Sequence, residues 1–263
     1  MINLYRVRDW YYLLGLTVLG FIFTRGGFCL CPDLWISLFI GSSYLSYGYS
    51  FNRLCDKEPR DWITRELFLV FAPILLGFIL AAMRLPRLML PLGIAVALNT
   101  AYSLPSILWK KNTLAGIVIN VYLFGCLFLI GSYAGNAAYS LPVIAMSSYM
   151  AAFFIPGQLC HELAHAEADK RSLFVIKNRQ RYSAAVLASV CFIFIFSLVL
   201  KIRLSLGMFF ICGHFLWAVF LWYFFKSRIW MDFSVDKARE LRKYFKITGM
   251  LFGIWYLIAF LRR

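Results

Sequence analysis

Negative charge is scarce in this chain. Asp and Glu contribute 12 of its 263 residues, against 27 Lys and Arg, and the formal net charge is +15. No linker and no low-complexity tract divides the sequence, which argues against a separate soluble domain. A small-x-small cleavage site is also missing behind the apolar run that follows Arg6 and Arg8. We therefore expect that run to be the first membrane span and not a signal peptide.

Apolar residues dominate the composition. The chain is 62% hydrophobic and its mean hydropathy is +0.74. Apolar runs of roughly 16–22 residues recur along it, and a helix needs about that length to cross a bilayer. We predict an all-α integral membrane protein with a single domain over residues 1–263. Its nine predicted spans cover residues 10–24, 34–51, 67–83, 88–105, 113–133, 140–158, 182–200, 205–225 and 245–261.

Basic residues are concentrated in alternate connections between these spans. With the N-terminus on the cytoplasmic side, most Lys and Arg fall on that side, as the positive-inside rule requires. Because these residues stand in short loops between apolar runs, they suit anionic lipid headgroups or an anionic substrate better than nucleic acid. We expect a multi-pass protein of a cell inner membrane or organelle membrane, with its active site on the cytoplasmic side.

Two stretches place acidic and amide side chains at the cytoplasmic ends of predicted spans. Asn52 and Asp56 lie one helical turn apart at the end of the span 34–51. Glu162, His165 and Asp169 have a spacing that puts them on one face of a helix. Carboxylate and amide oxygens suit Mg²⁺, which can neutralise a diphosphate leaving group. Basic residues of the same layer could bind phosphate oxygens, namely Lys57, Arg60, Lys110, Lys170 and Arg171.

These stretches, Tyr47–Asp61 and Glu162–Lys170, resemble the two motifs of the UbiA superfamily of intramembrane prenyltransferases. The first family motif reads Asn-(Asp/x)-x-x-Asp-x-x-x-Asp, and the second is rich in Asp. Residues Tyr102–Gly116 and Asp236–Lys246 are similar to two further inner segments of the family. The resemblance implies nine helices that surround a central cavity.

The resemblance also implies a reaction. Family members move an isoprenoid chain from a prenyl diphosphate to a hydrophobic acceptor, aromatic or lipid, and use Mg²⁺. The matching positions assign catalysis to Asn52, Asp56, Glu162, His165 and Asp169. They assign Mg²⁺ binding to Asn52, Asp56, Asp61, Glu162 and Asp169, and diphosphate binding to Arg60, Tyr102, Lys110, Lys170 and Arg171.

Three positions depart from the family pattern and leave alternatives open. Arg53, Arg60 and His165 stand where family members commonly carry Asp, which allows a non-catalytic protein that binds a lipid or a partner. A terpene cyclase, in which the allylic cation closes on its own chain, is a second alternative. The sequence His161-Glu-Leu-Ala-His165 is also the HExxH signature of zinc proteases, so an intramembrane zinc protease is a third.

The cysteines and the third histidine have simpler interpretations. The seven cysteines are odd in number and lie mostly inside apolar runs, so we predict small buried side chains and no disulfide framework. His214 lies near the middle of the span 205–225. We expect it to form a hydrogen bond between helices rather than to act in catalysis.

Overall fold

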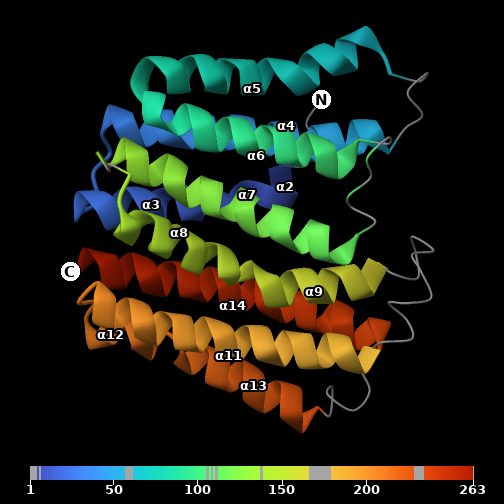
Figure 1. Ribbon diagram of the computed structural model, residues 1–263, viewed down its shortest axis with the longest axis vertical. Helices are drawn as coiled ribbons and strands as arrows, with labels where there is room; N and C mark the ends of the chain where they lie inside the picture. The colour runs from blue at the N-terminus through green and yellow to red at the C-terminus, as the bar shows by residue number, and fades with distance from the viewer. Residues whose placement is uncertain are drawn as a thin grey trace. The chain divides into compact units, whose positions relative to one another are not determined.

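Helices form every regular element in the part of the chain that the computed structural model describes, residues 5, 7–56, 62–104, 107, 109, 112–136, 139–165, 179–227 and 234–262. The chain divides into two compact units, Met1–Ser147 and Ser148–Arg263. The division falls within helix α8, Leu141–Ala152. Each unit is described by itself below (Figure 1).

The helices of the first unit precede α8, and those of the second follow it. The first unit contains α2 (Val7–Trp10), η1 (Tyr11–Leu13), α3 (Leu14–Arg25), α4 (Pro32–Cys55), α5 (Thr64–Arg84), η3 (Pro86–Leu88), α6 (Met89–Ser103) and α7 (Thr113–Ala134). The second contains α9 (Phe154–His165), α11 (Arg179–Arg203), α12 (Met208–Cys212), α13 (Phe215–Lys226) and α14 (Val235–Leu261).

Each predicted span coincides with helical structure, although several boundaries differ. The span 140–158 is divided between α8 and α9 by a turn at Phe153, and the span 205–225 is divided between α12 and α13 by a turn at Gly213 and His214. Helix α14 starts ten residues before the predicted span. Within the described residues, five helical segments are long and apolar enough to cross a membrane, namely Thr64–Arg84, Leu114–Ala134, Leu141–Leu163, Arg181–Arg203 and Val235–Leu261. The number of nine spans, the single domain and the orientation stay predictions.

The first unit is held together by a close contact between α3 and α7. A Cβ atom on Gly20 would overlap the backbone of α7 at Phe128, and one on Gly131 would overlap the backbone of α3 at Thr17. The Thr17 hydroxyl donates to the carbonyl of Leu127 at 3.1 Å. Small residues let two membrane helices approach to this distance, where dispersion and hydrogen bonds between them stabilise the pair.

Helix α4 packs against α5, α6 and α7 of the same unit. Tyr47 stacks on Phe51 with ring centroids 5.4 Å apart, and both rings contact Phe71 of α5. Phe51 is fully buried in this aromatic cluster. The cluster fixes the C-terminal half of α4, because large rings in a packed core leave little freedom to rotate.

In the second unit α9 packs against α11 and α14, and these helices lie side by side in Figure 1. The Tyr149 hydroxyl lies 3.0 Å from Nε2 of His214 and 2.7 Å from the hydroxyl of Tyr256. His214 also makes a hydrogen bond through Nδ1 with the carbonyl of Ile211, at 2.9 Å, and is 4% exposed. The prediction that His214 joins helices through a hydrogen bond is therefore confirmed.

All seven cysteines are free, which confirms that they form no disulfide framework. Cys55, Cys126 and Cys160 are buried, as expected. Cys191 and Cys212 are exposed, because their positions lie on the outward faces of α11 and α12. Cys29 and Cys31 lie between α3 and α4 and are half-buried.

Candidate functional site

The cytoplasmic end predicted for α4 carries the first candidate pair. Asn52 lies in the last turn of α4 and is half-buried, while Asp56 caps the helix at its C-terminus and is exposed. The backbone N–H of Asp56 donates to the carbonyl of Asn52 at 3.1 Å. The C-terminal end of a helix has a negative potential, so a carboxylate there is unfavourable unless a cation is near. The pair therefore forms a point of attraction for a positive ion.

Helix α6 holds this end of α4 through a line of polar contacts. The Ser103 hydroxyl donates to Oδ1 of Asn52 at 3.3 Å. One turn earlier, the hydroxyls of Tyr47 and Thr100 lie 2.6 Å apart. These two contacts set the rotation of α4 about its axis, and Ser103 sets the direction of the Asn52 amide.

Asn99 is a third polar residue of α6 at the contact with α4. Its side chain packs on Gly48, where an added Cβ would come within 3.2 Å of Nδ2. Asn99 is 6% exposed, and its Nδ2 has no hydrogen-bond partner among the described residues. A buried amide hydrogen without an acceptor is costly, so this group is available to a water molecule or to a substrate oxygen.

The second candidate stretch begins in α9. Glu162 is 4% exposed and accepts a hydrogen bond from Nε2 of Gln158 at 3.1 Å. A carboxylate buried to this extent needs donors, a cation or a proton, and Gln158 supplies one donor. His161 is half-buried on the same helix, and His165 is its last residue; nothing is described of the His165 side chain.

Tyr102 of α6 is half-buried in the first unit. Arg53 is exposed in the last turn of α4, next to Asn52 in the sequence. The remaining predicted site residues lie outside the described residues, so their roles stay predictions; they are Lys57, Arg60, Asp61, Lys110, Asp169, Lys170 and Arg171.

Oxygen donors at the end of α4 suit a hard cation. Mg²⁺ in proteins is usually held by one or two carboxylates together with substrate phosphates and water, so a complete protein cage is not required. Among the described residues no group of three His, Cys, Asp and Glu side chains is placed to hold a metal. Asp56 and the Asn52 amide oxygen match the smaller donor set that Mg²⁺ uses with a phosphate ligand.

Two residues that orient the candidate site were not predicted from the sequence. Ser103 follows Tyr102 directly, and only the packing of α6 on α4 shows that it binds Asn52. Gln158 stands four residues before Glu162. That spacing places two side chains on one helix face, so Gln158 could have been found from the sequence.

Comparisons with known proteins show the same architecture. No family model matches the sequence, and no curated protein matches it. A structure of digeranylgeranylglyceryl phosphate synthase superposes with a TM-score of 0.76 at 17% identity, over 100% of this chain and 98% of the other. A UbiA homologue from Archaeoglobus fulgidus bound to geranyl diphosphate and Mg²⁺ gives 0.71 at 15% identity over 100% of both chains. The same homologue bound to Cd²⁺ gives 0.67 at 15%. The all-helical, UbiA-like fold that the sequence motifs implied is thus confirmed, while the nine helices and the central cavity stay predictions.

Proposed function

We propose that this chain, which has the fold of UbiA homologues, is a divergent intramembrane prenyltransferase. It takes a prenyl diphosphate as donor and a hydrophobic acceptor, and it depends on Mg²⁺. The observation that carries the proposal is the Asn52–Asp56 pair at the negative end of α4, which Ser103 orients. Support comes from the shared fold, since one structure with that fold holds geranyl diphosphate with Mg²⁺.

In the proposed reaction the side chains prepare the diphosphate to leave. Mg²⁺, when bound, neutralises the charge that grows on the leaving diphosphate. Asn52 and Asp56 would hold the ion, and the family motif assigns the same role to Glu162 and Asp169. Lys110 and Lys170 add positive charge against the phosphate oxygens. We place the reaction on the cytoplasmic side of the membrane.

The proposed reaction requires a site from which water is excluded. An allylic cation reacts with water unless water is excluded. Tyr102 is half-buried and belongs to the helix that aligns Asn52, so it can face the substrate. Phe51, by contrast, is fully buried against Tyr47 and Phe71 and contributes to packing.

Mg²⁺-dependent release of diphosphate from labelled prenyl diphosphates tests the proposal. Protein in detergent or reconstituted membranes should release diphosphate, and Asp56→Ala should lower the rate at least tenfold, because it removes the only charged donor of the α4 pair. Arg84→Ala, an exposed position on the last turn of α5, is the matched control. Release from every chain length that equals the Asp56→Ala background would refute the proposal.

Product masses from the same membranes separate transfer from the alternatives. A prenylated adduct identifies transfer and its acceptor. A cyclised hydrocarbon identifies a terpene cyclase. The exposed Arg53 beside Asn52 favours a second candidate, a non-catalytic protein that binds the diphosphate through basic residues. That candidate predicts diphosphate binding that survives removal of Mg²⁺ by a chelator, and no product.

A further inference from the structure

A line of basic side chains runs along one face of α14 before that helix becomes apolar. Arg239, Arg242, Lys243 and Lys246 are all exposed. Their spacing of i, i+3, i+4 and i+7 places them on a single face of the helix. We refer to these four residues as the α14 basic stripe.

The stripe takes no part in the packing of its unit. The buried face of α14 is formed by other residues, Val235, Ala238, Leu241 and Phe245. Phe245 packs on Phe220 of α13, with ring centroids 4.6 Å apart. The four basic side chains therefore lie at the surface, on a face of α14 other than the buried one.

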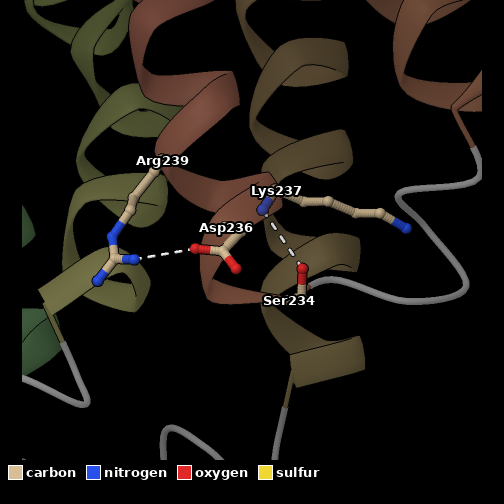
Figure 2. A network of polar contacts seen from close by, with 4 residues as sticks. All are labelled: Ser234, Asp236, Lys237 and Arg239. Carbon is tan, nitrogen blue, oxygen red and sulfur yellow. Dashed lines mark hydrogen bonds and ion pairs between the residues drawn. The ribbon is translucent and has the colours of Figure 1, made fainter.

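Two acidic residues, Asp236 and Glu240, lie close to the stripe in the first turns of α14. Asp236 forms an ion pair with Arg239 at 2.9 Å, in which the two side chains are 89% and 55% exposed (Figure 2). Surface pairs of this kind are weak. Glu240 accepts a hydrogen bond from the hydroxyl of Tyr223. Arg242, Lys243 and Lys246 extend the positive charge of the stripe beyond these two acids along the helix.

The exposed surface of α14 changes from basic to apolar between Lys246 and Ile247. The exposed side chains that follow are apolar, namely Ile247, Met250, Leu251, Ile254, Ile258 and Leu261. From Ile247 to Leu261 the helix rises about 21 Å, at 1.5 Å per residue, which is much of a hydrocarbon layer. The stripe covers about 10 Å directly before it. If the segment Ile247–Leu261 crosses the hydrocarbon layer, the stripe lies at the level of the headgroups.

We infer that the α14 basic stripe is a binding surface for anionic phospholipid headgroups. The inference is independent of the proposed function, because the stripe contains none of the residues assigned to the diphosphate. Phosphate groups could also reach it from a prenyl diphosphate. The lipid is favoured because the four side chains are exposed, are spread along the helix and continue directly into an apolar surface that contacts acyl chains.

The test is a titration of the purified full-length protein in neutral detergent with fluorescent phosphatidylglycerol and, separately, phosphatidylcholine. We expect phosphatidylglycerol to bind at least tenfold more tightly, and salt to weaken it. The variant Arg239→Gln/Arg242→Gln/Lys243→Gln/Lys246→Gln should lose that preference. The exchanges Lys243→Arg and Lys246→Arg, which keep the charge, should retain it.

Four basic residues that are predicted to lie on the outer side of the membrane provide a control variant that loses the same number of positive charges. The variant Arg84→Gln/Arg87→Gln/Lys201→Gln/Arg203→Gln should keep the preference for phosphatidylglycerol. Equal binding of both lipids by the unchanged protein, or an equal loss in this control, would overturn the inference. So would displacement of phosphatidylglycerol by inorganic diphosphate, which would assign the binding to the substrate site. Diphosphate release by the stripe variant should persist, so the outcome is distinct from that of the proposed function.

Discussion

At the scale of single residues, several polar side chains of the first unit lie at the contact between α4 and α6. Tyr47 pairs with Thr100 and Asn52 with Ser103. Asn99 packs on Gly48 of α4 and has an amide nitrogen that has no partner among the described residues. In a membrane protein a buried polar group is expensive and therefore commonly functional. Gly48 lies one turn before Asn52 on α4, so we expect Asn99 to orient a substrate or a bound water.

Exchanging Asn99 for Leu separates stability from function. Leu is similar in size to Asn. The exchange removes a buried donor without an acceptor, and such a donor lowers the stability of the folded protein by about 1–3 kcal/mol. We expect an unchanged or higher midpoint of thermal unfolding in detergent, together with slower diphosphate release. Ser103→Ala, which frees the Asn52 amide, should slow the release without that gain in stability. A Leu variant that unfolds earlier and keeps its turnover would show that Asn99 has only a packing role.

His165 distinguishes three interpretations, namely a prenyltransferase, a zinc protease and a non-catalytic protein. In a prenyltransferase, His165→Asp restores the carboxylate of the family motif, so Mg²⁺-dependent turnover should be kept or should rise. In a zinc protease the same exchange removes a ligand, so bound zinc and proteolysis should fall together. A non-catalytic protein should gain no turnover. One equivalent of zinc in the unchanged protein, absent from the Asp variant, would contradict our proposal.

At the scale of the helices, close contact depends on glycine. Helices α3 and α7 approach until Gly20 and Gly131 face the opposite backbone. The Thr24 hydroxyl donates to the carbonyl of Ser132 at 3.0 Å, and the Ser132 hydroxyl donates to the carbonyl of Gly20 at 3.4 Å. These bonds need the same short distance between helix axes. The contact therefore tolerates no added side-chain volume at either glycine.

The variant Gly131→Ala should destabilise the first unit. Its methyl group would overlap the carbonyl of Thr17, and overpacking of this kind costs about 1–3 kcal/mol or more. Gly93→Ala in α6 is the control, because no atom lies within 4 Å of its added Cβ and Ala favours a helix. Unfolding midpoints in one detergent check both. Equal midpoints for the two variants would show that α3 and α7 can separate without cost.

Helix positions could be predicted because hydrophobic run length follows directly from the bilayer. The turns that interrupt two of the predicted spans could not be predicted. These turns, at Phe153 and at Gly213 and His214, lie inside apolar runs with no charged residue to mark them. Helix α14 starts early because its charged first turns still form a helix, with Ser234 as N-cap. For the site, Asn52 and Asp56 were found by their spacing. Their partner Ser103 depends on packing between two helices, which no local pattern records.

At the scale of the whole molecule, the charge distribution predicts which ends of the helices face the cytoplasm. Basic residues suppress translocation of short loops, so the connections rich in Lys and Arg are expected inside. The connection between α3 and α4, which carries Cys29 and Cys31, is then outside. The first turn of α14 with Asp236 is inside. Both positions are accessible enough for chemical labelling, so the orientation can be measured.

A membrane-impermeant maleimide should label Cys29 or Cys31 in intact cells. The hydrogen bond from Cys29, backbone N–H groups and the charge of Arg25 lower the pKa of Cys31, whereas the same bond raises the pKa of Cys29. Maleimide reacts with the thiolate. Cys31 should therefore react at lower pH than Cys29, and Cys29→Ala should move its reaction to higher pH because the bond is lost. In a Cys29→Ser/Cys31→Ser background, Asp236→Cys should react only after the cells are permeabilised. Labelling of Asp236→Cys in intact cells, with Cys29 and Cys31 protected, would reverse the orientation and place the Asn52–Asp56 pair outside.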